Sequence, residues 1–271
     1  MKPKKILVLG SSGMLGHTVF ARCKPLFETF ELNREDLDAA DLNSEGVNKI
    51  LKINPHVIIN CMGIIKQLKE GPELSYAVNS VFPHKLNAIC SQNGIRLIHI
   101  STDCVFAGSK GMYTEKDTLT SVDTYGLSKR LGEVDYSPNA VTLRTSIIGH
   151  EASGKNLSLL DWFLSQKGSV NGFSKAVFSG FPTVELADII IKYVIPNPYL
   201  TGLYNVSAEP IDKYTLLNLI KETYKFDIEI KKEEEFVIDR SLDSSKFRSE
   251  TGYAPPSWSD LIKKMYMCKT L

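Results

Sequence analysis

The stretch that decides the fold is Lys-Ile-Leu-Val-Leu-Gly-Ser-Ser-Gly-Met-Leu-Gly, residues 5–16. Its apolar half is typical of a buried parallel strand, and an amphipathic helix follows the glycines to about Cys23. Gly10 allows a tight turn, Gly13 lets the backbone approach a pyrophosphate, and Gly16 lets the helix pack close to the strand. The helix N-terminus offers free N–H groups to the phosphates. Such a loop can be only a tight turn, but its position between strand and helix favours a dinucleotide site.

The same alternation of strand and helix continues through the first half of the chain. Further strands are expected at Glu28–Leu32, His56–Asn60, Arg96–Ile100 and Val141–Arg144. Alternation of this kind predicts an α/β protein with a Rossmann-type, doubly wound parallel sheet. We therefore expect a cofactor-binding domain over residues 1–150. Residues 151–271 should form mainly a small α/β substrate-binding lobe, with its chain interleaved with the first domain.

The remaining segments carry weaker patterns. A helical pattern over residues 73–93 contains Pro83, which predicts a kink or break there. Trp162 and Phe163 are expected in the core, residues 168–180 as an irregular polar segment, and residues 231–235 as a solvated turn or face. The other expected elements are helices ending near Lys52 and at 157–166, 183–195, 214–224 and 257–267, and short strands at 202–206 and 228–230.

Composition narrows the class of protein. The 271 residues carry a formal net charge of +1, so nothing calls for nucleic acid, an acidic partner or a membrane surface. The basic start of the chain precedes an apolar run that breaks at Gly10, unlike a signal peptide, and no run approaches the length of a membrane span. The five cysteines are scattered without a C-x-x-C motif. We therefore expect reduced thiols, no metal site and a cytoplasmic protein.

The end of the second expected strand bears on the choice of cofactor. A carboxylate at this position would bind the 2′-hydroxyl of the adenosine ribose. Here the strand ends in Asn33 and Arg34, and an arginine can pair with a 2′-phosphate. This favours NADP(H), with NAD(H) left open because Arg34 can equally be a solvated loop charge.

Two segments carry the chemistry. Ser101 and Thr102 follow a buried strand, at the edge where open α/β sheets bind ligands. Tyr125 and Lys129 are four residues apart and share one face of a predicted helix. An ammonium beside a phenol lowers the pKa of the tyrosine, and the Thr102 hydroxyl could serve the same substrate oxygen. Together they suit proton transfer in a C–OH/C=O interconversion, although the Tyr–Lys pair alone also fits a solvated helix face.

In their order and spacing these motifs resemble the extended short-chain dehydrogenases/reductases, and most closely the dTDP-4-dehydrorhamnose reductases. The resemblance is strong over about residues 4–150 and thin beyond them. The matching segments are Leu32–Asp38, Val57–Asn60, His99–Gly108, Tyr125–Lys129, Leu143–Ser146, Phe181–Thr183, Gly202–Val206 and Arg240–Asp243.

The resemblance implies the reaction and the residues that perform it. The reaction would be NADPH-dependent reduction of the 4-keto group of a nucleotide-diphosphate 4-keto-6-deoxy sugar for surface polysaccharide, by an enzyme that is often a homodimer. Tyr125 would donate the proton, Lys129 would hold the cofactor ribose, and Thr102 would hydrogen-bond the reacting oxygen. The expected cofactor-binding residues are Gly10, Gly13, Met14, Leu15, Gly16, Asn33, Arg34, Asp41, Leu42, Asn60, Cys61, Met62, Gly63, Ser101, Tyr125 and Lys129. The expected substrate-binding residues are Thr102, Asp103, Cys104, Ile147, Lys175 and Arg240.

Other interpretations stay open at this stage. Dehydratases of sugar nucleotides carry a glutamate where this chain has Cys104, which argues against a dehydratase. GDP-fucose synthases place a catalytic cysteine at this offset and need a later histidine, for which His150 is the only candidate. Cys104 therefore either packs on the loop or serves an epimerase or epimerase–reductase. A regulatory subunit of this fold is a third hypothesis, although it would not need an intact Thr102–Tyr125–Lys129 set. Lys175 and Arg240 can also be a solvated lysine and a structural ion pair.

Overall fold

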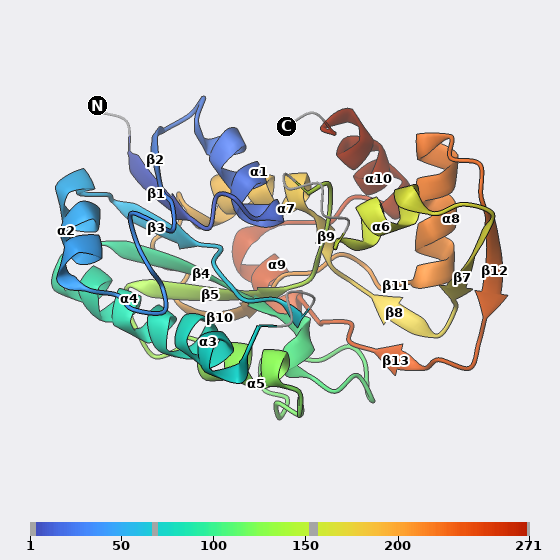
Figure 1. The fold of residues 1–271 in the computed structure, drawn as a ribbon, viewed down its shortest axis with the longest axis horizontal. Coiled ribbons are helices and arrows are strands. Elements are labelled where there is room, and N and C mark those ends of the chain that lie inside the picture. The colour runs from blue at the N-terminus through green and yellow to red at the C-terminus, as the bar shows by residue number, and fades with distance from the viewer. Residues whose placement is uncertain (1–3, 67–69, 152–156, 270–271) are drawn as a thin grey trace.

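Six parallel strands form the central sheet of the computed structural model, which describes residues 4–66, 70–151 and 157–269 (Figure 1). Across the sheet these strands are β10 (Gly202–Asn205), β5 (Ala140–Thr145), β4 (Arg96–Thr102), β3 (Val57–Asn60), β1 (Lys5–Leu9) and β2 (Glu28–Leu32). Each crossover between them runs through helical segments, as parallel pairing requires. The expected Rossmann-type α/β fold is confirmed.

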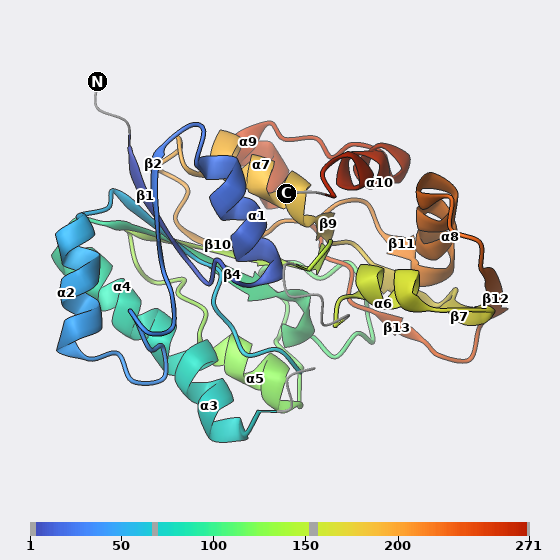
Figure 2. The same ribbon diagram turned by 45° about the horizontal axis from the view of Figure 1, so that its top comes forward.

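Helices cover both faces of this sheet, as Figure 2 shows most clearly. Along β1, Ile6 and Val8 pack towards one face, and Leu7 and Leu9 towards the other. The first face is covered by α1 (Met14–Cys23), α7 (Thr183–Ile189), its continuation η4 (Ile190–Val194) and α9 (Ser245–Thr251). The second is covered by α2 (Ser44–Ile53), η2 (Ala77–Val81) and α4 (Phe82–Gln92), with α3 (Pro72–Tyr76) and α5 (Thr124–Leu131) beside them.

The second half of the chain builds a smaller lobe around its own apolar cluster. The lobe contains α6 (Leu159–Ser165), α8 (Lys213–Tyr224), α10 (Trp258–Met267) and three small sheets. The strands of those sheets are β6 (Ile147–Ile148), β7 (Ser169–Phe173), β8 (Ala176–Phe178), β9 (Phe181–Pro182), β11 (Ile211–Asp212), β12 (Glu229–Glu233) and β13 (Ile238–Asp239).

Buried charges join the lobe to the main body. Lys264 on α10 donates to Asp188 (2.7 Å) and to Glu185 (2.5 Å) on α7, and Arg22 on α1 donates to Asp188 (2.6 Å). Both carboxylate side chains are 8 % exposed. Removing the lysine would leave them short of a counter-charge in a place where water cannot replace it.

Several predicted elements differ from the observed ones. The helix over residues 73–93 is interrupted by the π-helical turn η2, just before Pro83, rather than at the proline itself. Trp162 was expected in the core but is 39 % exposed, whereas Phe163 is buried. Residues 168–180 are not irregular, because they form β7 and β8. The charge run 231–235 has the expected solvated face but begins inside β12 rather than in a turn, and its pairing with β7 leaves Lys231 and Lys232 exposed and Glu233 half-buried.

Among the helices in the described part of the chain, none has both the length and the apolar character needed to cross a membrane.

Candidate active site

The loop after β1 is built by close backbone contacts. Gly10 has φ +80°, and a Cβ there would lie 2.9 Å from the Met62 nitrogen. Gly16 sits against the same loop, since a Cβ on it would lie 2.1 Å from the Gly10 carbonyl oxygen. Gly13 is the exposed residue that precedes α1, and its N–H donates to the Gly10 carbonyl (3.0 Å). Gly13 therefore presents bare backbone and the free N–H groups of a helix start.

The side chains of Met14 and Leu15 differ in what they can offer to a ligand. Met14 is half-buried at the first position of α1, whereas Leu15 is 5 % exposed and packs in the core beneath the sheet. Leu15 was expected among the cofactor-binding residues, but only its backbone lies at the helix start.

The loop after β3 lies next to the glycine loop. Asn60 is fully buried, donates to His99 Nδ1 (3.1 Å) and accepts from the Met62 N–H (3.1 Å). Its side chain is therefore used to hold the Cys61–Gly63 loop rather than turned to a ligand. Burial raises the pKa of the Cys61 thiol to about 12, so Cys61 is a neutral, small side chain. Gly63 is exposed, and a Cβ on it would lie 4.0 Å from Lys129 Nζ, so this loop borders Lys129.

The turn after β2 exposes the positively charged side chain of Arg34. Asn33 Oδ1 accepts from the N–H groups of Glu35 (2.8 Å) and Asp36 (3.1 Å), so Asn33 shapes the turn. Arg34 is exposed, and among the described residues its guanidinium has no hydrogen-bond or ion-pair partner. Asp41 is exposed and Leu42 half-buried in the connection to α2.

Thr102, Tyr125 and Lys129 come together at the carboxyl edge of the sheet. Thr102 ends β4 and is 7 % exposed, and its hydroxyl donates to Asp103 Oδ1 (3.2 Å) and accepts from the Cys104 N–H (3.1 Å). The same hydroxyl lies close enough to the phenol of Tyr125 to lower the pKa of that tyrosine. Tyr125 and Lys129 both lie on α5, whose start is capped by Asp123 accepting from the Gly126 N–H (2.8 Å). The capped helix thus aims both side chains at the strand end.

The pKa of Tyr125 differs from what the sequence predicts. Burial raises it above its ordinary value, as do nearby acidic groups, and the Thr102 hydroxyl opposes the shift. The Nζ of Lys129 donates to the Ile100 carbonyl (2.7 Å). The expectation of a lowered Tyr125 pKa is therefore wrong for this structure, because burial raises the pKa. The phenol is held protonated, which suits a proton donor.

Ser101 also has a role other than the expected one. Its side chain is 3 % exposed and donates to Glu133 Oε1 (2.7 Å), so it faces the interior rather than a cofactor.

Asp103, Cys104 and Arg240, which were expected to bind the substrate, lie close together beyond the end of β4. Arg240 donates from Nε to the Phe106 carbonyl (2.9 Å), and its Nη1 lies 3.6 Å from Cys104 Sγ. Burial raises the pKa of Asp103, which Arg240 partly offsets, and burial raises the pKa of Cys104 to about 12. Cys104 is thus a thiol rather than a thiolate here. Ile147 is half-buried in β6, which follows directly after β5.

The lysine that lies beside Asp103, Cys104 and Arg240 is Lys213, not the expected Lys175. Lys175 is exposed between β7 and β8, and its charge faces Glu234. Lys213 opens α8, directly after the capping residue Asp212, and burial lowers its pKa while Asp103 and Cys104 raise it. Sequence analysis missed Lys213 because β11 and β13, which are far apart in the sequence, pair with the two sides of β8. Lys213 follows β11 and Arg240 follows β13, so the pairing brings these two residues to the same small sheet. The N-cap signal at Asp212 was the only local indication of where this lysine lies.

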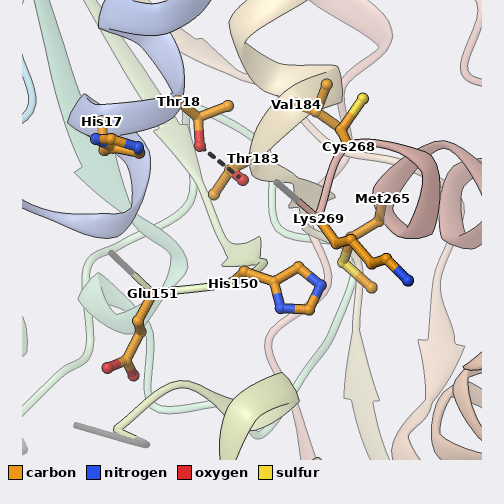
Figure 3. Close-up of a pocket in the computed structure, with 9 residues that line it drawn as sticks. All are labelled: His17, Thr18, His150, Glu151, Thr183, Val184, Met265, Cys268 and Lys269. Atoms are coloured by element: carbon orange, nitrogen blue, oxygen red, sulfur yellow. Dashed lines mark hydrogen bonds between the residues drawn. The ribbon is translucent and has the colours of Figure 1, made fainter. Parts of the chain in front are cut away.

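A small cavity of about 60 Å³ lies apart from these residues and contains His150 (Figure 3). It is lined by His17, Thr18, His150, Glu151, Thr183, Val184, Met265, Cys268 and Lys269. The ring nitrogens of His150 lie 3.2 Å from Asp161 Oδ1 and 2.9 Å from the Tyr224 hydroxyl. His150 is therefore engaged away from Cys104, and the Cys–His pair that an epimerase–reductase would need is not formed.

Comparison with known proteins assigns the chain to a family. The sequence matches the family described as the RmlD substrate binding domain over residues 4–268. It is 34 % identical over 132 residues to the dTDP-4-keto-6-deoxy-D-glucose reductase of Streptomyces niveus, covering 47 % of this chain and 45 % of that protein. It is 32 % identical over 159 residues to Agl14 of Haloferax volcanii, named as a probable low-salt glycan biosynthesis reductase, with 52 % of each chain covered. The chain thus spans about half the length of these two relatives.

The fold has close counterparts among solved structures. A dTDP-4-dehydrorhamnose reductase from Bacillus anthracis, solved in complex with NADP, superposes with a TM-score of 0.87 at 20 % identity, covering 98 % of this chain and 99 % of that one. At this identity the likeness speaks for the fold alone. Because the family match extends over nearly the whole sequence, the chain belongs to the RmlD substrate binding domain family.

Proposed function

We propose that this member of the RmlD family is an NADPH-dependent reductase of the 4-keto group of a nucleotide-diphosphate 4-keto-6-deoxy sugar. The observation that carries the proposal is the meeting of Thr102, Tyr125 and Lys129 beside the exposed Gly63 loop. The name of the S. niveus relative describes the same reaction class on a dTDP-linked sugar. The product would feed a surface polysaccharide.

The residues of the glycine loop fit a dinucleotide. Gly13 and Gly63 are exposed without side chains, and Gly10 and Gly16 leave no room for one, so the backbone itself would contact the pyrophosphate. Arg34 would bind the 2′-phosphate of NADP(H), since its guanidinium is exposed at the end of β2. NAD(H) would lack this contact and bind more weakly.

NADPH, when bound, supplies the hydride. Tyr125 donates the proton to the developing alkoxide, and burial keeps its phenol protonated until that moment. Thr102 hydrogen-bonds the same oxygen. Lys129 has three N–H donors, one of which binds the Ile100 carbonyl, so the others remain for the cofactor ribose.

The basic residues of the lobe would bind the substrate's diphosphate. Arg240 and Lys213 stand beside Asp103 and Cys104 and supply two positive charges there. We assign cofactor binding mainly to residues 1–150 and substrate binding mainly to residues 151–271. A cytoplasmic location and a homodimer stay predictions of the family resemblance.

Reduction fits this site better than the alternatives. The raised pKa of Cys104 and the engagement of His150 with Asp161 and Tyr224 argue against epimerisation. The complete Thr102–Tyr125–Lys129 set argues against a purely regulatory subunit.

The test is NADPH oxidation, followed by absorbance, with a panel of nucleotide 4-keto-6-deoxy sugars generated in situ by dehydratases. Oxidation with one sugar, lost in Tyr125→Phe, would establish the reaction and name the substrate. Tight NADPH binding without oxidation of any panel member would contradict the proposal.

A further inference from the structure

Glu133 occupies a fixed position just after the catalytic helix. Its side chain is 6 % exposed, and its carboxylate accepts from Arg144 Nε (2.7 Å) and Nη2 (2.6 Å) and from Ser101 Oγ (2.7 Å). The preceding Gly132 has no room for a side chain, because a Cβ there would lie 1.8 Å from the Asn79 carbonyl oxygen. The carboxylate therefore has a single, well-supported location.

Lys129 and Glu133 are tied to consecutive residues of β4. Lys129 is 4 % exposed and donates to the Ile100 carbonyl (2.7 Å), while Glu133 accepts from the hydroxyl of the next residue, Ser101 (2.7 Å). The two side chains are four residues apart along the chain and converge on the same strand end. This places a buried negative charge behind a buried ammonium.

The electrostatic surroundings of Lys129 give this carboxylate its importance. Burial lowers the pKa of Lys129 to about 8, and Glu133 raises it. The other titratable groups that face the ammonium are Cys61 and His99, and both are neutral because burial raises the pKa of Cys61 and lowers that of His99. Among these groups, Glu133 is thus the only one that carries a negative charge at neutral pH.

We propose that Glu133 is a positioning residue that keeps the Lys129 ammonium charged and directed at the cofactor side of the site, with Arg144 and Ser101 holding its carboxylate in place. The inference rests on the proposed role of Lys129 in holding the cofactor. It assigns a positioning role to the Arg144–Glu133 ion pair, which would otherwise serve only to hold the segment after α5 against β5.

The test compares two variants with the parent protein. Glu133→Gln alone leaves the Arg144 guanidinium buried without its counter-charge and can fail to fold. The double variant Glu133→Gln/Arg144→Met removes both charges and so avoids an unpaired one. Arg144→Lys is the matched control, because it alters the packing at residue 144 but keeps a counter-charge beside Glu133 and keeps the carboxylate near Lys129.

The readouts are the pH profile of kcat/KM and the pH dependence of NADPH affinity. In the double variant, we expect the alkaline limb of both to move down by about one pH unit, a roughly tenfold loss above that limb. In Arg144→Lys, the limb should stay in place, since the carboxylate near Lys129 keeps its negative charge. Equal shifts in both variants, or no shift in a folded double variant, would overturn the inference. NADPH binding needs no sugar, so the result stands even if the proposed substrate class is wrong.

Discussion

Replacing Gly16 by alanine tests the packing on which the cofactor loop depends. A Cβ at this position would lie 2.1 Å from the Gly10 carbonyl oxygen and 2.6 Å from its carbonyl carbon. An ordinary contact is about 3.5 Å, so the loop would have to move by more than ~1 Å. Both obstructing atoms belong to the backbone, and rotation of a side chain cannot relieve the clash.

The movement has two measurable consequences. Overpacking of this kind costs about 1–3 kcal/mol, and for a chain of this size each kcal/mol lowers Tm by about 2–4 °C. The shifted loop would also misplace the N–H groups at the start of α1, which should weaken NADPH binding by about tenfold. Differential scanning fluorimetry and fluorescence titration measure the two effects.

Gly252→Ala is the matched control. Gly252 has φ +71° with nothing within 4 Å of an added Cβ, and it ends α9, away from the loop. The strain of a left-handed alanine should lower stability by about 1 kcal/mol without changing NADPH affinity. If Gly16→Ala kept the parent Tm and affinity, the close approach of α1 to the loop would be refuted.

The other predictions concern chemistry, cofactor choice and stability. Tyr125→Phe should keep NADPH binding and lower kcat by about 10²–10⁴, because the proton donor is gone; near-parent turnover in the reductase assay would remove Tyr125 from its role. Arg34→Ala should raise the Kd of NADPH about tenfold and leave that of NADH unchanged, and equal changes in calorimetry would show that Arg34 does not read the 2′-phosphate. Lys264→Met should lower the free energy of unfolding by about 2–3 kcal/mol at pH 7. Burial raises the pKa of Asp188, but Lys264 and Arg22 outweigh it and hold that pKa below its usual value. The ion pair therefore stabilises above about pH 4 and is lost on acidification, so urea melts should show the variant and parent converging at low pH.

Local sequence signals predicted the half of the site that lies on the first strands and helices. The apolar run before Gly10 and the polar residues at the end of β4 each follow from a short pattern, and parallel pairing then aligns them at one edge of the sheet. The presence of Tyr125 and Lys129 on one helix could be predicted from their four-residue spacing alone. The direction of the Lys129 side chain could not be predicted, because it depends on the Ile100 carbonyl of a different element.

The substrate side depended on pairings between distant segments. Lys175 was expected there because of its place in a polar stretch, but that stretch folds into two strands that carry it away. Lys213 lies there instead because of two strand pairings. Asp212 pairs with Val177 on one side of β8, and Asp239 pairs with Val177 on the other side. The residues that follow them, Lys213 and Arg240, are therefore brought close together. No period or turn signal encodes the neighbourhood of residues 177, 212 and 239. In the same way, the charge run looked like a solvated turn because edge strands tolerate charges on both faces.

The sixth strand of the sheet has a consequence for how the protein is made. β10 lies beside β5 but is separated from it by residues 146–201, so a ribosome must synthesise the chain to about residue 205 before the edge of β5 is covered. Until then one edge of β5 is unpaired in the nascent chain, although all six of its residues are buried in the folded protein. The first 150 residues contain the whole glycine loop and α5, yet they lack β10, the edge strand that covers β5. A fragment ending there should therefore aggregate rather than bind a dinucleotide, and the window between residues 150 and 205 is where a holding chaperone would be most useful during synthesis.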